Sequence, residues 1–357
     1  FLSPYKLIDA KGKVVLPGFI DPHTHPVFAG SRASEFLSRL SGISYLEIQE
    51  RGGGILSTVQ ETRKASKEDL LFSLLEMAKL FLSYGTTTIE AKSGYGLNFK
   101  DELKMLEVIK EGNKFSKLSL VPTFLGAHSI PWEFKEAPLD YIKFISREVY
   151  PEISLRGLAR FSDVFLEKGV FNFDESFEYL MDGKRFGLIP KVHADEFSDQ
   201  NGAFLSSKVD AISADHLLFS SDEGFKTMAK KGVIAVLLPG TVFSLNLPYY
   251  PRARKMLDFG LAIAIGTDFN PGTCLCPSQF MMIDLAVIKM GMSIEEALNA
   301  VTINSAYAIG EEKEKGSLDI GKIADIIILN VSSYIEIPYR WGQNLISKVI
   351  KKGKIVK

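Results

Sequence analysis

The five histidines are the residues of this chain best suited to chemistry, and each lies at or near the end of a stretch with the composition of a β-strand. They are His23, His25, His128, His193 and His216. Side chains two residues apart on a strand point the same way, so His23 and His25 can share one metal ion. His193 and Asp268 end other expected strands, and three imidazoles with one carboxylate suit Zn²⁺ or another divalent transition metal. The sequence therefore predicts a metal site at His23, His25, His193 and Asp268, with an Asx turn or a cap before Asn270 as the alternative for Asp268.

Glu196 and His216 are candidate proton-transfer residues beside this metal site. On a regular strand Glu196 and His193 face opposite sides, so Glu196 reaches the site only if the chain turns at Asp195. Without that turn, Glu196 is a solvated loop carboxylate. His216 ends the next strand, where an imidazole can orient a water or relay its proton. Spacing leaves open whether His216 is a further ligand.

Arg32 and the glycine-rich loops are candidates for substrate binding. Arg32 opens a predicted helix over residues 31–40, which is the unfavourable end for a cation, so it either holds an anion or lies at the surface. Gly94 and Gly96 flank Tyr95 and allow a tight turn that presents the phenol. Asn270 to Thr273 adds main-chain N–H donors and small polar groups.

The elements that position these residues alternate between short β-branched runs and amphipathic helices, which indicates βα units around a parallel sheet. Helical periods lie between the runs, for example over residues 67–83 and 101–112. Eight such units match an α/β fold of the (β/α)₈ TIM barrel type, whose catalytic face lies where the strands end. The eight runs are residues 18–25, 86–92, 118–128, 162–167, 189–196, 211–216, 233–239 and 261–268.

Both ends of the chain carry short strands with Gly-Lys turns, which are typical of antiparallel hairpins. We therefore expect a small β-domain formed from residues 1–16 and 312–357, and a barrel over residues 17–311.

The composition of the chain indicates which class of partner it binds and in which compartment it works. The 42 Lys and Arg residues nearly balance the 43 Asp and Glu residues, giving a formal charge of −1. That balance argues against nucleic acid and anionic membranes and favours a small-molecule substrate. Cys274 and Cys276 are too close in sequence for a useful disulfide, and we expect no secretory signal, so a cytoplasmic location is predicted. The longest uncharged stretch, residues 232–251, contains three prolines and is not expected to span a membrane.

Six motifs, in their order and spacing, resemble the imidazolonepropionase family of the amidohydrolase superfamily over nearly the whole chain. They are LPGFIDPHTHPVFAGSR, EAKSGYG, FLGAHSIP, KVHADEF, SADHL and GTDFNPGT. PGFIDPHTH indicates the superfamily, whereas Arg32, nine residues after His23, and the KSGYG and NPG loops indicate the family. The resemblance implies one Zn²⁺ or iron ion at His23, His25, His193 and Asp268, with His216 as a catalytic imidazole. It implies substrate contacts from Arg32, Tyr95, His128, Glu196, Asn270, Gly272 and Thr273.

Two departures from the family pattern add expectations. Members usually carry several dozen residues more before PGFIDPHTH, so the small domain, a β-sandwich in the family, is expected to be incomplete at its N-terminus. Binuclear relatives carry a carboxylated lysine at the end of the fourth strand, whereas here that strand ends in Glu167 and Lys168, with Lys168 expected outside the mouth. A mononuclear site follows, and the resemblance also implies a homodimer.

The reaction implied is hydrolysis of 4-imidazolone-5-propanoate to N-formimino-L-glutamate in histidine degradation. A bound divalent ion lowers the pKa of its water toward about 7 and polarises the carbonyl. His216 would stabilise the oxyanion, and Asp268 or Glu196 would protonate the departing ring nitrogen. One alternative is a mononuclear deaminase of the cytosine or guanine type, which would release ammonia. A catalytically inactive barrel is the other, and the complete ligand set argues against it.

Overall fold

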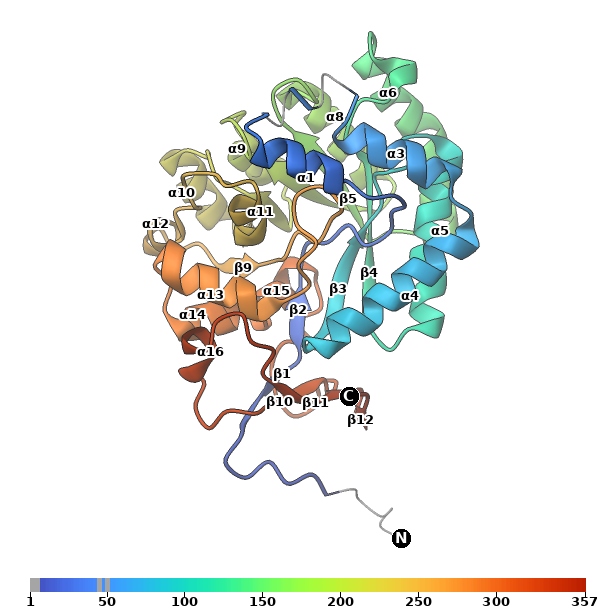
Figure 1. Ribbon diagram of the computed structural model, residues 1–357. Helices are drawn as coiled ribbons and strands as arrows, with labels where there is room; N and C mark the ends of the chain where they lie inside the picture. Colours follow the sequence, from blue (N-terminus) through green and yellow to red (C-terminus); the bar gives the residue numbers. More distant parts are fainter. Residues whose placement is uncertain (1–6, 44–46, 49–51) are drawn as a thin grey trace.

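The computed structural model describes residues 7–43, 47–48 and 52–357, and a parallel barrel of eight strands lies at its centre (Figure 1). Each strand pairs in parallel with the next one along the chain. The predicted (β/α)₈ TIM barrel is confirmed, with several strands shorter than the predicted runs. The strands are β2 (Phe19–Asp21), β3 (Thr86–Lys92), β4 (Ser119–Ala127), β5 (Phe161–Leu166), β6 (Ile189–Ala194), β7 (Ser213–His216), β8 (Ile234–Leu237) and β9 (Ile263–Ile265).

The first and last strands meet where the predicted metal ligands lie. Thr24 and Phe269 form a parallel bridge just beyond the ends of β2 and β9. The His25 N–H donates to the Phe269 carbonyl at 2.8 Å, and the Asp268 N–H donates to the His23 carbonyl at 3.1 Å. Although β2 ends at Asp21, the chain through Thr24 therefore stays paired, and the residues on either side of Thr24 can face the same way.

Helices follow most strands and cover the barrel (Figure 1). The predicted helix over residues 67–83 is α4, in which Leu70, Leu74 and Ala78 are buried at every fourth position. No helix in the described ranges is both long and apolar enough to cross a membrane. The helices are α1 (Ala33–Leu40), α3 (Ile55–Lys64), α4 (Lys67–Ser83), α5 (Phe99–Phe115), η1 (Trp132–Phe134), α6 (Pro138–Phe144), η2 (Ile145–Val149), α7 (Tyr150–Arg156), α8 (Phe173–Arg185), α9 (Gly202–Lys208), α10 (Asp222–Lys231), α11 (Pro239–Ser244), α12 (Ala253–Asp258), α13 (Gln279–Met290), α14 (Ile294–Ala300), α15 (Ile303–Ala308) and α16 (Glu336–Tyr339).

The two ends of the chain form an antiparallel sheet, which lies at the end of the barrel away from α1 and α3 (Figure 1). Its order is β1 (Val14–Pro17), β10 (Ile326–Leu329), β11 (Ile346–Lys351) and β12 (Lys354–Ile355). The prediction that both termini contribute strands is confirmed. Within the described residues this region is one sheet rather than the two of a sandwich, and residues 1–6 of the predicted segment lie outside them.

Gly85 lies between α4 and β3, where the barrel packs against this terminal sheet. It follows α4 with φ +84°, and a Cβ there would lie 2.5 Å from Cδ1 of Ile346 on β11. Gly187 is a matched position after α8, since it has φ +83° and open space around it. The two glycines therefore adopt the same left-handed backbone conformation, and only Gly85 is packed against a neighbouring side chain.

We expect Gly85→Ala to destabilise the protein more than Gly187→Ala. Both alanines cost about 1–2 kcal/mol for the left-handed backbone, and only Gly85→Ala adds an overlap worth about 1–3 kcal/mol. Urea denaturation monitored by circular dichroism measures the difference in unfolding free energy. Equal losses in the two variants would show that the contact with Ile346 relaxes without cost.

Candidate metal and active site

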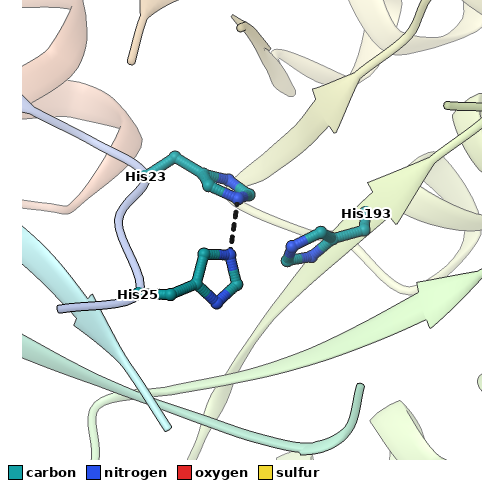
Figure 2. Close-up of side chains that lie close together, drawn as sticks. All are labelled: His23, His25 and His193. Carbon is teal, nitrogen blue, oxygen red and sulfur yellow. Dashed lines mark hydrogen bonds between the residues drawn. The ribbon is translucent and has the colours of Figure 1, made fainter. Parts of the chain in front are cut away.

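Three histidine side chains converge just beyond the barrel strands (Figure 2). His23 and His25 follow β2, and His193 lies on β6. The His23 Nε2 and His25 Nε2 atoms are 3.3 Å apart, and Oδ1 of Asp268 lies 3.5 Å from each. One nitrogen from each histidine falls within a group whose members lie within 4.8 Å of one another. The structure thus brings together the four predicted ligands, which come from the first, fifth and eighth barrel strands.

The donor atoms fit one divalent cation. Tetrahedral zinc with bonds of about 2.0–2.1 Å to nitrogen requires ligand atoms about 3.3–3.4 Å apart, close to the observed 3.3 and 3.5 Å. Burial lowers the pKa of His23 and His25 well below the usual range, with a smaller contribution from nearby charges, so both offer neutral imidazoles. The Nε2 atom of His193 is buried and has no hydrogen-bond partner in the described part of the chain. Burial raises the pKa of Asp268 to about 6.

Two buried aspartates hold the outer sides of these imidazoles. Oδ2 of Asp215 lies 2.6 Å from Nδ1 of His23, in hydrogen-bond contact. Oδ2 of Asp163 lies 3.0 Å from Nδ1 of His193, although the two are not aligned as a hydrogen bond. A carboxylate behind a ligating histidine fixes the ring and its tautomer. Asp215 and Asp163 therefore orient His23 and His193 toward the convergence point.

Two lysines lie beneath the aspartates, inside the barrel. Lys92 Nζ is 2.6 Å from Asp163 Oδ2 and 3.6 Å from Asp215 Oδ2. Lys191 Nζ is 3.8 Å from the same Asp215 oxygen, and both ammonium groups lie 3.0 Å from Glu90 Oε2. Burial works against the charge on Lys92, but the surrounding carboxylates raise its pKa above the ordinary value. Sequence reasoning missed this cluster, although Glu90 and Lys92 alternate on β3 in a way that could have marked an inward polar face.

Glu196 reaches the site because the chain turns as the sequence required. Asp195 has φ +54°, a left-handed conformation that takes the chain out of β6. Its carboxylate accepts hydrogen bonds from the N–H groups of Gln200 and Gly202 at 2.9 and 2.8 Å, which holds the turn. Glu196 then lies with Oε2 3.6 Å from Nε2 of His216. Burial raises the pKa of Glu196 well above its usual range and lowers that of His216 well below.

A cavity opens onto these groups. Of the predicted site residues, all but His23 and Gly272 line it, together with the apolar side chains of Ile55, Phe165 and Phe197. Charged and polar groups combined with a few apolar side chains are typical of a site for a small polar metabolite. The lining residues predicted from sequence are His25, Arg32, Tyr95, His128, His193, Glu196, His216, Asp268, Asn270 and Thr273.

Arg32 is buried at the cavity wall, with 5% of its surface exposed, so the surface alternative is wrong. It lies at the N-terminus of α1, and its Nε donates to Oε2 of Glu35 at 2.8 Å. A Cβ on Gly272 would lie 2.0 Å from Nη1 of Arg32. Gly272 thus belongs to the site by leaving room for the guanidinium, although it does not line the cavity.

The outer end of the fourth barrel strand, β5, supplies no cation to the site. Lys168, the lysine nearest that end, is exposed. Glu167 before it is buried and accepts main-chain N–H groups from residues after β6, beginning with Phe197 at 2.9 Å. Neither Glu167 nor Lys168 lines the cavity.

Known proteins with related sequences and folds show which family the chain belongs to. The profile of the Amidohydrolase family matches residues 6–44 and 198–357. An imidazolonepropionase from Geobacillus sp. (strain WCH70) is 48% identical over 355 residues, which cover 99% of this chain and 84% of the relative. One from Brevibacillus brevis is 49% identical over 351 residues, covering 98% and 82%.

Solved structures show the same fold at lower identity. A 5-methylcytosine deaminase from Klebsiella pneumoniae liganded with phosphonocytosine superimposes with a TM-score of 0.73 at 16% identity, covering 100% of this chain and 90% of that one. An adenosine deaminase from Xanthomonas campestris with bound zinc gives 0.70 at 17%, covering 96% and 80%. At such identities these two support the fold alone, whereas the full-length sequence relatives decide the family. The chain belongs to the imidazolonepropionase family of the amidohydrolases.

Proposed function

We propose that this protein hydrolyses 4-imidazolone-5-propanoate to N-formimino-L-glutamate, a step of histidine degradation. The observation that carries the proposal is a single cavity in which a buried guanidinium, Arg32, lies on the wall with His25, His193 and Asp268. The substrate has a carboxylate on a short tail and a cyclic amide to be opened. Arg32 and Tyr95 suit binding of the carboxylate, and the histidine cluster with Glu196 and His216 suits opening of the cyclic amide.

His23, His25, His193 and Asp268 would hold one divalent ion, zinc or iron, in this proposal. Such an ion, when bound, supplies an acidic water and polarises a carbonyl. His216 lies beside the cluster with Nε2 turned toward Glu196, so it is placed to stabilise charge on the substrate oxygen.

We assign to Glu196 the proton that the departing ring nitrogen takes up. Both oxygens of Asp268 are engaged, since Oδ1 faces the imidazoles and Oδ2 accepts from the Thr241 hydroxyl at 2.5 Å. Glu196 lines the cavity and has no such second partner in the described residues beyond its contact with His216. Asn270, held by its own turn to Gly272 and Thr273, completes the wall around the ring, and His128 lies beside Tyr95.

We further propose a cytoplasmic homodimer, in which residues 17–311 form the barrel and residues 1–16 with 312–357 form the small domain. Free Cys274 and Cys276 suit a reducing compartment. The near-neutral charge of −1 supports a small-molecule substrate rather than nucleic acid or an anionic membrane.

The metal-loaded protein is expected to convert 4-imidazolone-5-propanoate to N-formimino-L-glutamate without releasing ammonia. Loss of imidazolone absorbance, product identification by mass spectrometry and an ammonia assay on one sample measure this. A deaminase would release ammonia from cytosine or guanine and leave the propanoate untouched. Absence of formiminoglutamate from metal-replete protein would refute the proposed reaction.

The purified protein is expected to hold one divalent ion per chain. His23→Ala removes a ligand and should abolish tight binding, because water replaces the fourth donor. Asp215→Asn keeps the shape but weakens the support of His23, so metal affinity should fall about 10- to 100-fold. Elemental analysis and chelator competition give both numbers. Two ions per chain, or an unchanged affinity in Asp215→Asn, would contradict the site as described.

Arg32 is expected to bind the propanoate carboxylate, since guanidinium offers two parallel charge-assisted hydrogen bonds where lysine offers a point charge. Arg32→Ala should weaken transition-state binding by about 2–4 kcal/mol and Arg32→Lys by less, with metal content unchanged. Tyr95→Phe should give a smaller loss that is not additive with Arg32→Ala. Steady-state kinetics on the propanoate and on an analogue lacking the carboxylate measure the effect. An equal loss on both substrates would exclude carboxylate binding at Arg32.

A further inference from the structure

Two carboxylates beside the cavity are buried without a cationic partner in the described chain. Glu102 is 2% exposed and Glu167 is 5% exposed, and neither forms an ion pair with any described lysine, arginine or histidine. A buried carboxylate is costly unless hydrogen bonds replace its hydration. Both are compensated mainly by main-chain N–H groups, and in each case most of those groups belong to a loop that carries a cavity residue.

Glu102 holds the loop around Tyr95. Oε1 of Glu102 accepts from the N–H groups of Gly96 at 2.8 Å and Leu97 at 2.9 Å, and both of its oxygens accept from Gly94 at 3.1 and 3.2 Å. The Gly94 carbonyl in turn lies 3.0 Å from Nδ1 of His128. One carboxylate therefore fixes the two residues flanking Tyr95 and, through Gly94, the ring of His128.

The loop lies directly on the first turn of α5, which contains Glu102. A Cβ on Gly96 would lie 2.4 Å from the main-chain nitrogen of Glu102. Since that contact is with backbone, the loop would have to move to admit an alanine. The N-terminal end of a helix favours a negative charge on Glu102, whereas burial raises the pKa of its carboxyl.

Glu167 holds the segment that follows Glu196. Oε2 of Glu167 accepts from the N–H groups of Phe197 at 2.9 Å and Ser198 at 3.3 Å, and Oε1 accepts from the Ser198 hydroxyl. Oε1 also accepts from the Lys168 N–H at 2.9 Å, and this bond holds the Glu167 side chain against the end of β5. Glu196 is thereby fixed between the turn at Asp195 and the residues bound by Glu167.

We propose that Glu102 and Glu167 are positioning residues for opposite ends of the substrate. Glu102 fixes the wall that receives the propanoate tail, and Glu167 fixes the side chain that protonates the ring nitrogen. This division rests on the proposed function for the roles of Tyr95 and Glu196, whereas the two loop attachments rest on the hydrogen bonds alone.

Glutamine is the informative replacement at both positions. It preserves volume but converts one acceptor oxygen into an NH₂ donor that would face main-chain N–H groups, and it removes the charge that strengthens the remaining bonds. Glu175 supplies a matched control, because its carboxylate also accepts a main-chain N–H, from Asn172 at 2.9 Å, but it caps α8 and does not line the cavity.

Hydrogen exchange followed by mass spectrometry tests the loop attachments without any substrate. In the metal-loaded protein, Glu102→Gln should speed exchange in peptides covering residues 93–98, and Glu167→Gln should do so over residues 196–199. Glu175→Gln should change neither. Unchanged exchange in the first two variants, or faster exchange spread over the whole barrel, would overturn the proposal.

Steady-state kinetics on 4-imidazolone-5-propanoate test the division of roles. Glu102→Gln should raise KM about 10-fold or more with kcat within about 3-fold, and Glu167→Gln should lower kcat about 10- to 100-fold with KM within about 3-fold. Gly96→Ala, which displaces the loop and leaves the Glu102 charge in place, should reproduce the KM effect. Metal content and thermal stability of each variant are measured alongside.

Each result has a distinct meaning. The same pattern of KM and kcat in both glutamine variants would overturn the division, even if both loops exchange faster. Wild-type protein that shows the expected exchange pattern in its variants but no turnover of the propanoate would refute the proposed function and leave the loop attachments standing.

Discussion

The ion pairs inside the barrel hold the two aspartates that orient His23 and His193 at its mouth. Lys92 and Lys191 lie among Glu90, Asp163 and Asp215, all fully buried, with contacts from 2.6 to 3.8 Å. Removing one member would leave an uncompensated charge in a low-dielectric interior, which costs about 3–5 kcal/mol. The cluster is therefore a rigid unit, and its two aspartates transmit that rigidity to the imidazoles of His23 and His193.

Left-handed backbone conformations recur where strands give way to the site. Asp195, His216 and Asp268 have φ of +54°, +73° and +50°, and none is glycine. Such residues cost about 1–3 kcal/mol each and persist where the surroundings determine them. Here they sit at the ends of three strands, where each turns its own or the next side chain toward the cavity. The carboxylate of Asp195 stabilises its turn by accepting hydrogen bonds from the N–H groups of Gln200 and Gly202.

The sequence was sufficient to place a site residue or an element where the residue type is rare or where a helical pattern extends over many residues. All five histidines and the eight strands could be placed because imidazoles are few and because the strands alternate with helices such as α4. The turn at Asp195 could only be stated as a condition, since aspartate adopts left-handed backbone in some contexts and not in others. Arg32 stayed undecided because burial of an arginine depends on the loop at Gly272, which comes from the other end of the barrel.

Acidic residues explain most of what sequence reasoning missed. Glu102 occupies the first turn of a helix and Glu167 follows a strand, and acids are common at both places on the surface of any enzyme. Their function depends on which N–H groups the tertiary fold brings within reach. The N–H groups that donate to Glu167 lie on the neighbouring βα loop, and no local sequence pattern predicts those hydrogen bonds.

The ligand order along the chain bears on how the protein matures during synthesis. His23 and His25 follow the first barrel strand, His193 lies on the fifth, and Asp268 follows the eighth, so a nascent chain holds an incomplete donor set until its last strand has left the ribosome. A divalent ion bound to all four would also bridge the seam at which Thr24 meets Phe269. Metal binding would then stabilise closed barrels relative to open ones, and only after the last barrel strand has folded.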